Sequence, residues 1–218
     1  MKRELKLCDI VLVVHNINVQ LLSQEWMLKN GIFSEQELLC SALIFTDSII
    51  QISTPKCELV ITGNRFLLRV KRKSDCKEGI RRIKKILAAL SSLSYSAVGI
   101  NFEWSASPLK NILKTTAKNF LPSSAKTPWF KEFGTESPAI VGASYYRKFQ
   151  ESFMTLKIYP DASEVIDYSE GKSARMVLNF NFHFRVGKED PLKSMDDYLN
   201  TWEDKYAEAD RLTKLFLE

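Results

Sequence analysis

Residues 177–186 read VLNFNFHFRV, a stretch in which polar and apolar side chains alternate. The polar positions are Asn179, Asn181, His183 and Arg185. Two amides, an imidazole and a guanidinium can donate hydrogen bonds to carboxylates, carbonyls or phosphates. Because successive side chains of a β-strand point to opposite faces, the spacing of two predicts that these four groups share one face. We therefore treat them as candidate binding residues.

Catalytic chemistry has little support in the sequence. His15 and His183 are the only histidines, and neither has a second imidazole nearby along the chain. Glu103 could act as a base with His183 as the acid, but no pattern pairs a nucleophile with a base. The cysteines lack the close spacing of zinc ligands, and the glycines form no phosphate-binding loop. We predict no catalytic residue, no metal site and no cofactor, and a dispersed hydrolase site is the third hypothesis.

A basic segment is the second candidate site. Residues 65–85 hold ten Lys or Arg residues against two Asp or Glu residues. Such a concentration of charge attracts polyanions, although charge runs more often only make a surface soluble. A nucleic-acid-binding function would use Arg65, Arg69, Lys71, Arg72, Lys73, Arg81 and Lys85 as phosphate contacts.

Trp129 and Phe130 are a third candidate. They lie in the segment KTPWFKEFGTESP, which has neither a helical nor a strand period. Aromatic residues in such a loop can anchor a partner protein, or they can pack the loop onto its own core. The sequence leaves both interpretations open.

Composition predicts a folded cytoplasmic protein. The 218 residues are 45% hydrophobic, enough for a sizeable core in one large domain or two half-size units. No apolar run approaches the roughly 20 residues of a membrane span, so we expect no membrane association. Four widely spaced cysteines predict reduced, mostly buried thiols. The net charge of +5 is concentrated before residue 94, where 15 basic residues face 9 acidic ones.

Hydrophobic periodicity predicts the same order of elements in both halves of the chain: strand, helix, four strands and helix. In the first half these are a strand at 9–14, a helix at 21–29, strands at 41–46, 49–53, 57–62 and 65–72, and a helix at 78–90. In the second half they are a strand at 95–104, a helix at 107–120, strands at 140–149, 152–159, 164–168 and 174–186, and a long helix from Pro191.

This repeated order resembles the duplicated TATA-binding-protein-like fold, in which two such units join their sheets into a curved saddle with helices on the convex side. The resemblance covers nearly the whole chain as an order of elements. The DNA-binding members carry phenylalanine wedges on a largely apolar floor. The floor predicted here is polar, with its phenylalanines on the helix side, so the resemblance does not imply TATA-type binding. The strand at Tyr95–Phe102 is also similar to one in a family of uncharacterised prokaryotic proteins.

We therefore predict an α+β fold of two pseudo-repeats, residues 1–93 and 94–218, that form one curved antiparallel sheet with helices on one face. The favoured function is a non-enzymatic binding protein whose partner is another protein or a second copy of the chain. Nucleic-acid binding through the basic segment is the alternative.

Overall fold

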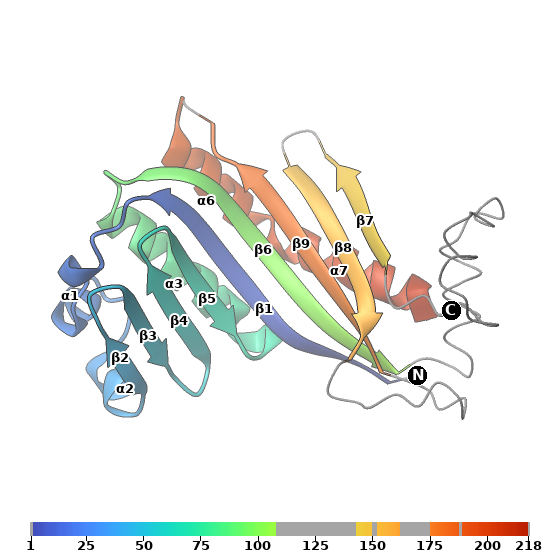
Figure 1. Ribbon diagram of the computed structural model, residues 1–218, viewed down its shortest axis with the longest axis horizontal. Helices are drawn as coiled ribbons and strands as arrows, with labels where there is room; N and C mark the ends of the chain where they lie inside the picture. Colours follow the sequence, from blue (N-terminus) through green and yellow to red (C-terminus); the bar gives the residue numbers. More distant parts are fainter. Residues whose placement is uncertain (1, 108–142, 150–151, 162–174, 188, 218) are drawn as a thin grey trace, which may run out of the picture.

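The computed structural model describes residues 2–107, 143–149, 152–161, 175–187 and 189–217. Its centre is one antiparallel sheet with the strand order β2-β3-β4-β5-β1-β6-β9-β8-β7 (Figure 1). The strands are β1 (Lys2–His15), β2 (Ala42–Phe45), β3 (Ile49–Ser53), β4 (Cys57–Thr62), β5 (Arg65–Val70), β6 (Ser94–Ser107), β7 (Ala143–Lys148), β8 (Ser152–Pro160) and β9 (Met176–Arg185). The predicted α+β class and antiparallel sheet are confirmed.

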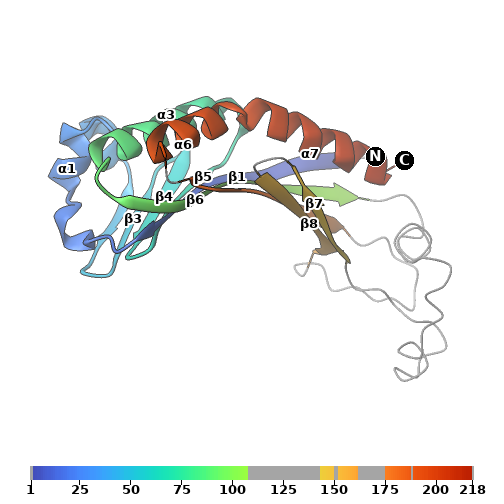
Figure 2. The ribbon, with the colours of Figure 1, turned by 90° about the horizontal axis from the view of Figure 1, so that it is seen from above.

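Helices cover one face of this sheet. The described helices are η1 (Val19–Leu21), α1 (Gln24–Lys29), α2 (Glu35–Leu39), η2 (Lys73–Asp75), α3 (Cys76–Ala89), α6 (Pro191–Asn200) and α7 (Trp202–Leu217). Figure 2 shows α3, α6 and α7 along the convex side of a curved sheet, with α1 at the end of the molecule that holds β2 to β4. The opposite, concave side of the sheet carries none of the described helices.

Alternation of side chains along each strand produces the core. In β5, Phe66, Leu68 and Val70 are buried, whereas the intervening residues are partly or fully exposed. The four phenylalanines with the most deeply buried side chains are Phe66, Phe102, Phe180 and Phe182. Because apolar side chains stabilise the fold by leaving water, the central strands present their apolar sets to the helices, whereas β2 and the described side chains of β7 are mostly exposed. The predicted helix-side position of these phenylalanines is confirmed.

The strand order is similar in the two halves of the chain. In the first half β1 is innermost and is followed outward by β5, β4, β3 and β2; in the second, β6 is innermost and is followed by β9, β8 and β7. The two innermost strands pair with each other from Lys2–Ser107 to His15–Ser94. This arrangement fits the duplication inferred from the sequence, which stays a prediction.

Some local predictions need correction. The helix expected at 21–29 is a 3-10 turn followed by the short α1, and α2 was not predicted at all. The expected single terminal helix is divided at Thr201 into α6 and α7. Ser107, predicted to cap a helix, is the last residue of β6. The strand expected at 164–168 and residues 108–120 of the expected helix lie outside the described residues.

Candidate functional site: the open face of the sheet

The sheet face opposite the helices, which we call the open face, is formed by every second residue of the strands. Pairing registers align its side chains in rows that cross the sheet. A polar row contains Glu58, Arg69, Asp9, Asn101, Asn181 and Thr155. The adjacent, more apolar row contains Val60, Leu67, Val11, Gly99, His183 and Phe153.

An ion pair lies near the centre of the polar row. The Arg69 guanidinium donates two hydrogen bonds to the Asp9 carboxylate, from Nε at 3.0 Å and from Nη2 at 3.1 Å. Asp9 is only 7% exposed, so its charge is removed from water and requires such a partner. These hydrogen bonds raise the pKa of Arg69 above its ordinary value, with further support from the charges of Glu58 and Glu103. Two of the five N–H donors of Arg69 are therefore used within the chain.

A second polar cluster lies one row along the strands. Asn179 Nδ2 donates a hydrogen bond of 3.1 Å to Glu103 Oε2. Burial raises the pKa of Tyr159, and the neighbouring Glu103 carboxylate raises it further. Asn101, in the polar row between Asp9 and Asn181, has a buried Oδ1 that accepts no hydrogen bond from the described residues.

His183 belongs to the more apolar row and packs against an aromatic ring. The centroids of the His183 and Phe153 rings are 4.6 Å apart, and Phe153 also contacts Tyr146 at 5.4 Å. Burial lowers the pKa of His183, and the positive charge of Arg185 lowers it further. Glu103 pairs with Asn179, four residues from His183 along β9, which is roughly 13 Å. The acid–base pair considered from the sequence is therefore not assembled.

The structure brings most of the predicted binding residues to this one face. Asn179, Asn181, His183 and Arg185 share it, as the alternation predicted. Arg65 and Arg69 come from β5, on the other side of the central pair. Lys71, just after β5, donates a hydrogen bond of 3.0 Å to the backbone carbonyl of Thr54. Trp129 and Phe130 lie outside the described residues.

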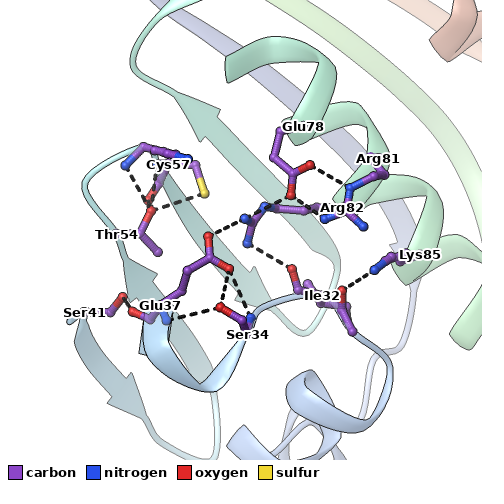
Figure 3. A network of polar contacts seen from close by, with 12 residues as sticks. Ile32, Ser34, Glu37, Ser41, Thr54, Cys57, Glu78, Arg81, Arg82 and Lys85 are labelled. Carbon is purple, nitrogen blue, oxygen red and sulfur yellow. Dashed lines mark hydrogen bonds and ion pairs between the residues drawn. The ribbon is translucent and has the colours of Figure 1, made fainter. Parts of the chain in front are cut away.

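The basic segment does not form one surface. Figure 2 shows α3 on the convex side of the sheet, whereas the alternation along β5 turns Arg65 and Arg69 to the other side, away from the buried Phe66, Leu68 and Val70. Arg82 of α3 contacts the carboxylates of Glu37 and Glu78 (Figure 3). It also donates a hydrogen bond of 2.9 Å to the carbonyl oxygen of Ile32, so its role is structural. Three other basic side chains of α3 have acidic partners: Lys77 with Glu203, Arg81 with Glu78 and Lys84 with Asp196. Lys85 donates to the carbonyl of Gly31.

Asp9 and Tyr159 were not predicted as members of the site. The period of two along the strand does place Tyr159 on the open face with Thr155 and Lys157, but Tyr159 was not among the predicted binding residues. Asp9 immediately precedes an apolar run, and no local signal indicates its partner, which is 60 residues away.

Other features of the described residues bear on metal binding, cysteine chemistry and membrane spans. These residues contain no group of three or more His, Cys, Asp or Glu side chains placed to hold a metal ion. All four cysteines are free, with Cys40 exposed and the other three buried. None of the described helices has the length and apolar character needed to cross a membrane. Comparisons with models of protein families and with curated proteins find no match for this chain.

Proposed function

We propose that this protein is a non-enzymatic binding protein whose open face binds another protein, either a partner or a second copy of the chain. The observation that carries the proposal is the mixture of groups on that face. Asp9, Glu58 and Glu103 lie among its cations, and Val11, Leu67 and Phe153 are only partly buried. Partly exposed apolar side chains between charges of both signs suit a protein surface better than a polyphosphate.

The proposal is tested by changing an apolar residue of the open face. Leu67 lies beside Val11 across β1 and β5 and is partly exposed, so Leu67→Glu adds a charge where the partner would bind. We expect this substitution to weaken binding by about tenfold or more. The measurement is self-association by light scattering, or capture of a partner from the native host. The matched control is Leu215→Glu on α7, where the side chain is 53% exposed. Equal association by the wild type and Leu67→Glu would contradict the proposal.

Nucleic acid is the second candidate, favoured by Arg65 and Arg185. Both are exposed on the open face and form no ion pair within the described part of the chain. Binding through phosphates would require steep salt dependence, because each neutralised phosphate releases counterions. With about four to six phosphate contacts, a fourfold rise in salt weakens binding by roughly a hundredfold or more. Titration of labelled oligonucleotides with the wild type and with the double variant Arg65→Glu/Arg185→Glu separates the two functions. Binding by the wild type that the double variant loses would favour nucleic acid. We expect the wild type not to bind the oligonucleotides even at low salt.

A further inference from the structure

A hollow of about 750 Å³ lies on the helix side of the sheet, where α6 meets α7 above the start of β8 and the end of β9. Its volume is within the range of small-molecule sites. The residues of its wall that matter here are Phe149, Phe184, Lys193, Asp197, Tyr198 and Lys205. The open face is on the other side of the sheet, so a ligand of this hollow is independent of the proposed function.

Lys205 gives this hollow a partly buried positive charge. Its ammonium nitrogen lies 4.9 Å from the ring centroid of Phe149, 5.7 Å from that of Phe182 and 5.8 Å from that of Tyr198. No carboxylate of the described residues forms an ion pair with it. Burial lowers its pKa, although the more distant charges of Asp204 and Glu208 oppose this effect. Aromatic faces stabilise a cation but leave its hydrogen-bonding capacity unused.

The surrounding groups define the ligand that would fit. Lys193 is a second cation of the wall, and Asp197 is an exposed anion there. The two lysines and the aspartate together give the wall a net charge of one positive unit. Phe184 stacks on Tyr198 with ring centroids 4.9 Å apart, and both side chains are mostly buried, so the partly buried ring of Phe149 is the main aromatic group open to a ligand. The Tyr198 hydroxyl is buried and has no hydrogen-bond partner among the described residues. The hydroxyl groups of Ser194 and Thr201 already donate to backbone carbonyls, so the lysines are the main donors.

We propose that this hollow binds a small molecule with one carboxylate and a flat aromatic body. The carboxylate would pair with the Lys205 ammonium, and the aromatic body would lie against the partly buried ring of Phe149, with the edge of Phe184 beside it. A single net positive charge in the wall favours a monoanion over a phosphate dianion. Binding of the anion supplies the neutralising partner that this partly buried lysine lacks within the described part of the chain.

Isothermal titration calorimetry with the full chain tests the site, using 2-naphthoate as the probe and 2-naphthamide as its neutral analogue. We expect naphthoate to bind and naphthamide to bind at least about tenfold more weakly, because a hydrogen bond to a charged group is worth about 1.5–3 kcal/mol, or roughly tenfold to a hundredfold. Inorganic phosphate should bind more weakly than naphthoate. Naphthamide binding as tightly as naphthoate, or no binding of naphthoate, would overturn the proposal.

Substitution of the lysine locates the binding. Lys205→Met keeps the apolar stem and removes the charge. We expect this variant to bind naphthoate at least about tenfold more weakly than the wild type does, which is the difference expected between naphthamide and naphthoate. Lys214→Met, on the same helix but paired with Asp210, is the matched control and should change binding by less than about twofold. Lys205→Arg, which retains the charge, should retain part of the affinity and guards against a folding defect of Lys205→Met. If Lys205→Met binds naphthoate as the wild type does, the site is elsewhere and the proposal is wrong.

Discussion

Arg82 fixes the segment that contains α1 and α2 to α3. Its side chain is 4% exposed, contacts two carboxylates and lies over the ring of Phe33 with a distance of 4.5 Å to the centroid. Burial by itself raises the pKa of Glu37, but the backbone N–H of Ser34 and the Arg82 guanidinium outweigh it, so the pKa lies below its usual range. The pair is thus a stabilising partnership that depends on both members.

Removal of Arg82 should therefore be costly. We expect Arg82→Met to lower the free energy of unfolding by about 2–4 kcal/mol, because Glu37 and Glu78 lose their shared cation. Denaturant unfolding measures this change. Arg81→Met, which removes an exposed neighbour on the same helix, should change it by less than about 0.5 kcal/mol. Equal losses in the two variants would contradict the structural role of Arg82.

The same partnership predicts a pH dependence. A glutamate whose pKa is lowered in the folded state stabilises the protein above its unfolded-state pKa, and this stability is lost as the pH falls through the folded-state value. The wild type should therefore be more stable than Arg82→Met at neutral pH, and this difference in stability should shrink as the pH falls into the acidic range. Melting temperatures of both proteins across that range provide the measurement.

At the scale of elements, Gly79 determines how closely α3 approaches the sheet. A Cβ atom at this position would lie 2.7 Å from Val70 Cγ2 and 3.3 Å from Leu68 Cδ2. Alanine favours a helix over glycine by about 1 kcal/mol. The steric clash of this Cβ atom with Val70 should outweigh the gain in helix propensity, because the buried Val70 side chain has little room to move.

We expect Gly79→Ala to destabilise the protein by about 1–3 kcal/mol despite its better helix propensity. Gly63→Ala is the control, since a Cβ there would meet nothing within 4 Å. Chemical denaturation of the two variants gives the comparison. A stability gain in Gly79→Ala would show that α3 can shift away from β5 at little cost.

The central strands were predictable because they carry an alternating burial pattern. Phe180 and Phe182 alternate with Asn181 and His183, so the face of each side chain follows from local parity. The division at Thr201 was not predictable, since the apolar spacing continues through it. The capping box of Ser34 and Glu37 is a local signal from which α2 could have been predicted.

The open face was predictable only in part. Local alternation predicts which residues point to it, but not their neighbours across strands. The contact of Arg69 with Asp9 depends on the register between β1 and β5. Registers between strands distant in the sequence are set by turns and packing of the whole sheet, so the members of the polar row could not be predicted from the chain alone.

At the scale of the whole molecule, the two halves depend on each other. The central β1–β6 pairing spans most of both strands, and Lys84 of α3 forms an ion pair of 2.8 Å with Asp196 of α6. Separated halves would each expose the edge of a long strand. The two halves of the chain are therefore joined through both the sheet and the helix layer.

We expect residues 1–93 produced alone to aggregate or dimerise, and co-production with residues 94–218 to give a soluble one-to-one complex. Size-exclusion chromatography with light scattering distinguishes these states. A stable monomer of residues 1–93 with a cooperative melting transition would show that the first half folds independently.

The central position of β1 also has a consequence during synthesis on the ribosome. β1 is made before the other described strands, yet Ile10 has its partners at Leu68 and Ile100. At roughly 5–20 residues per second, the ribosome needs about 5–20 s to add the 90 residues from Val11 to Ile100. Throughout that time the apolar stretch of β1 has at least one unpaired edge. We therefore expect nascent chains of this protein to bind ribosome-associated chaperones until β6 has emerged.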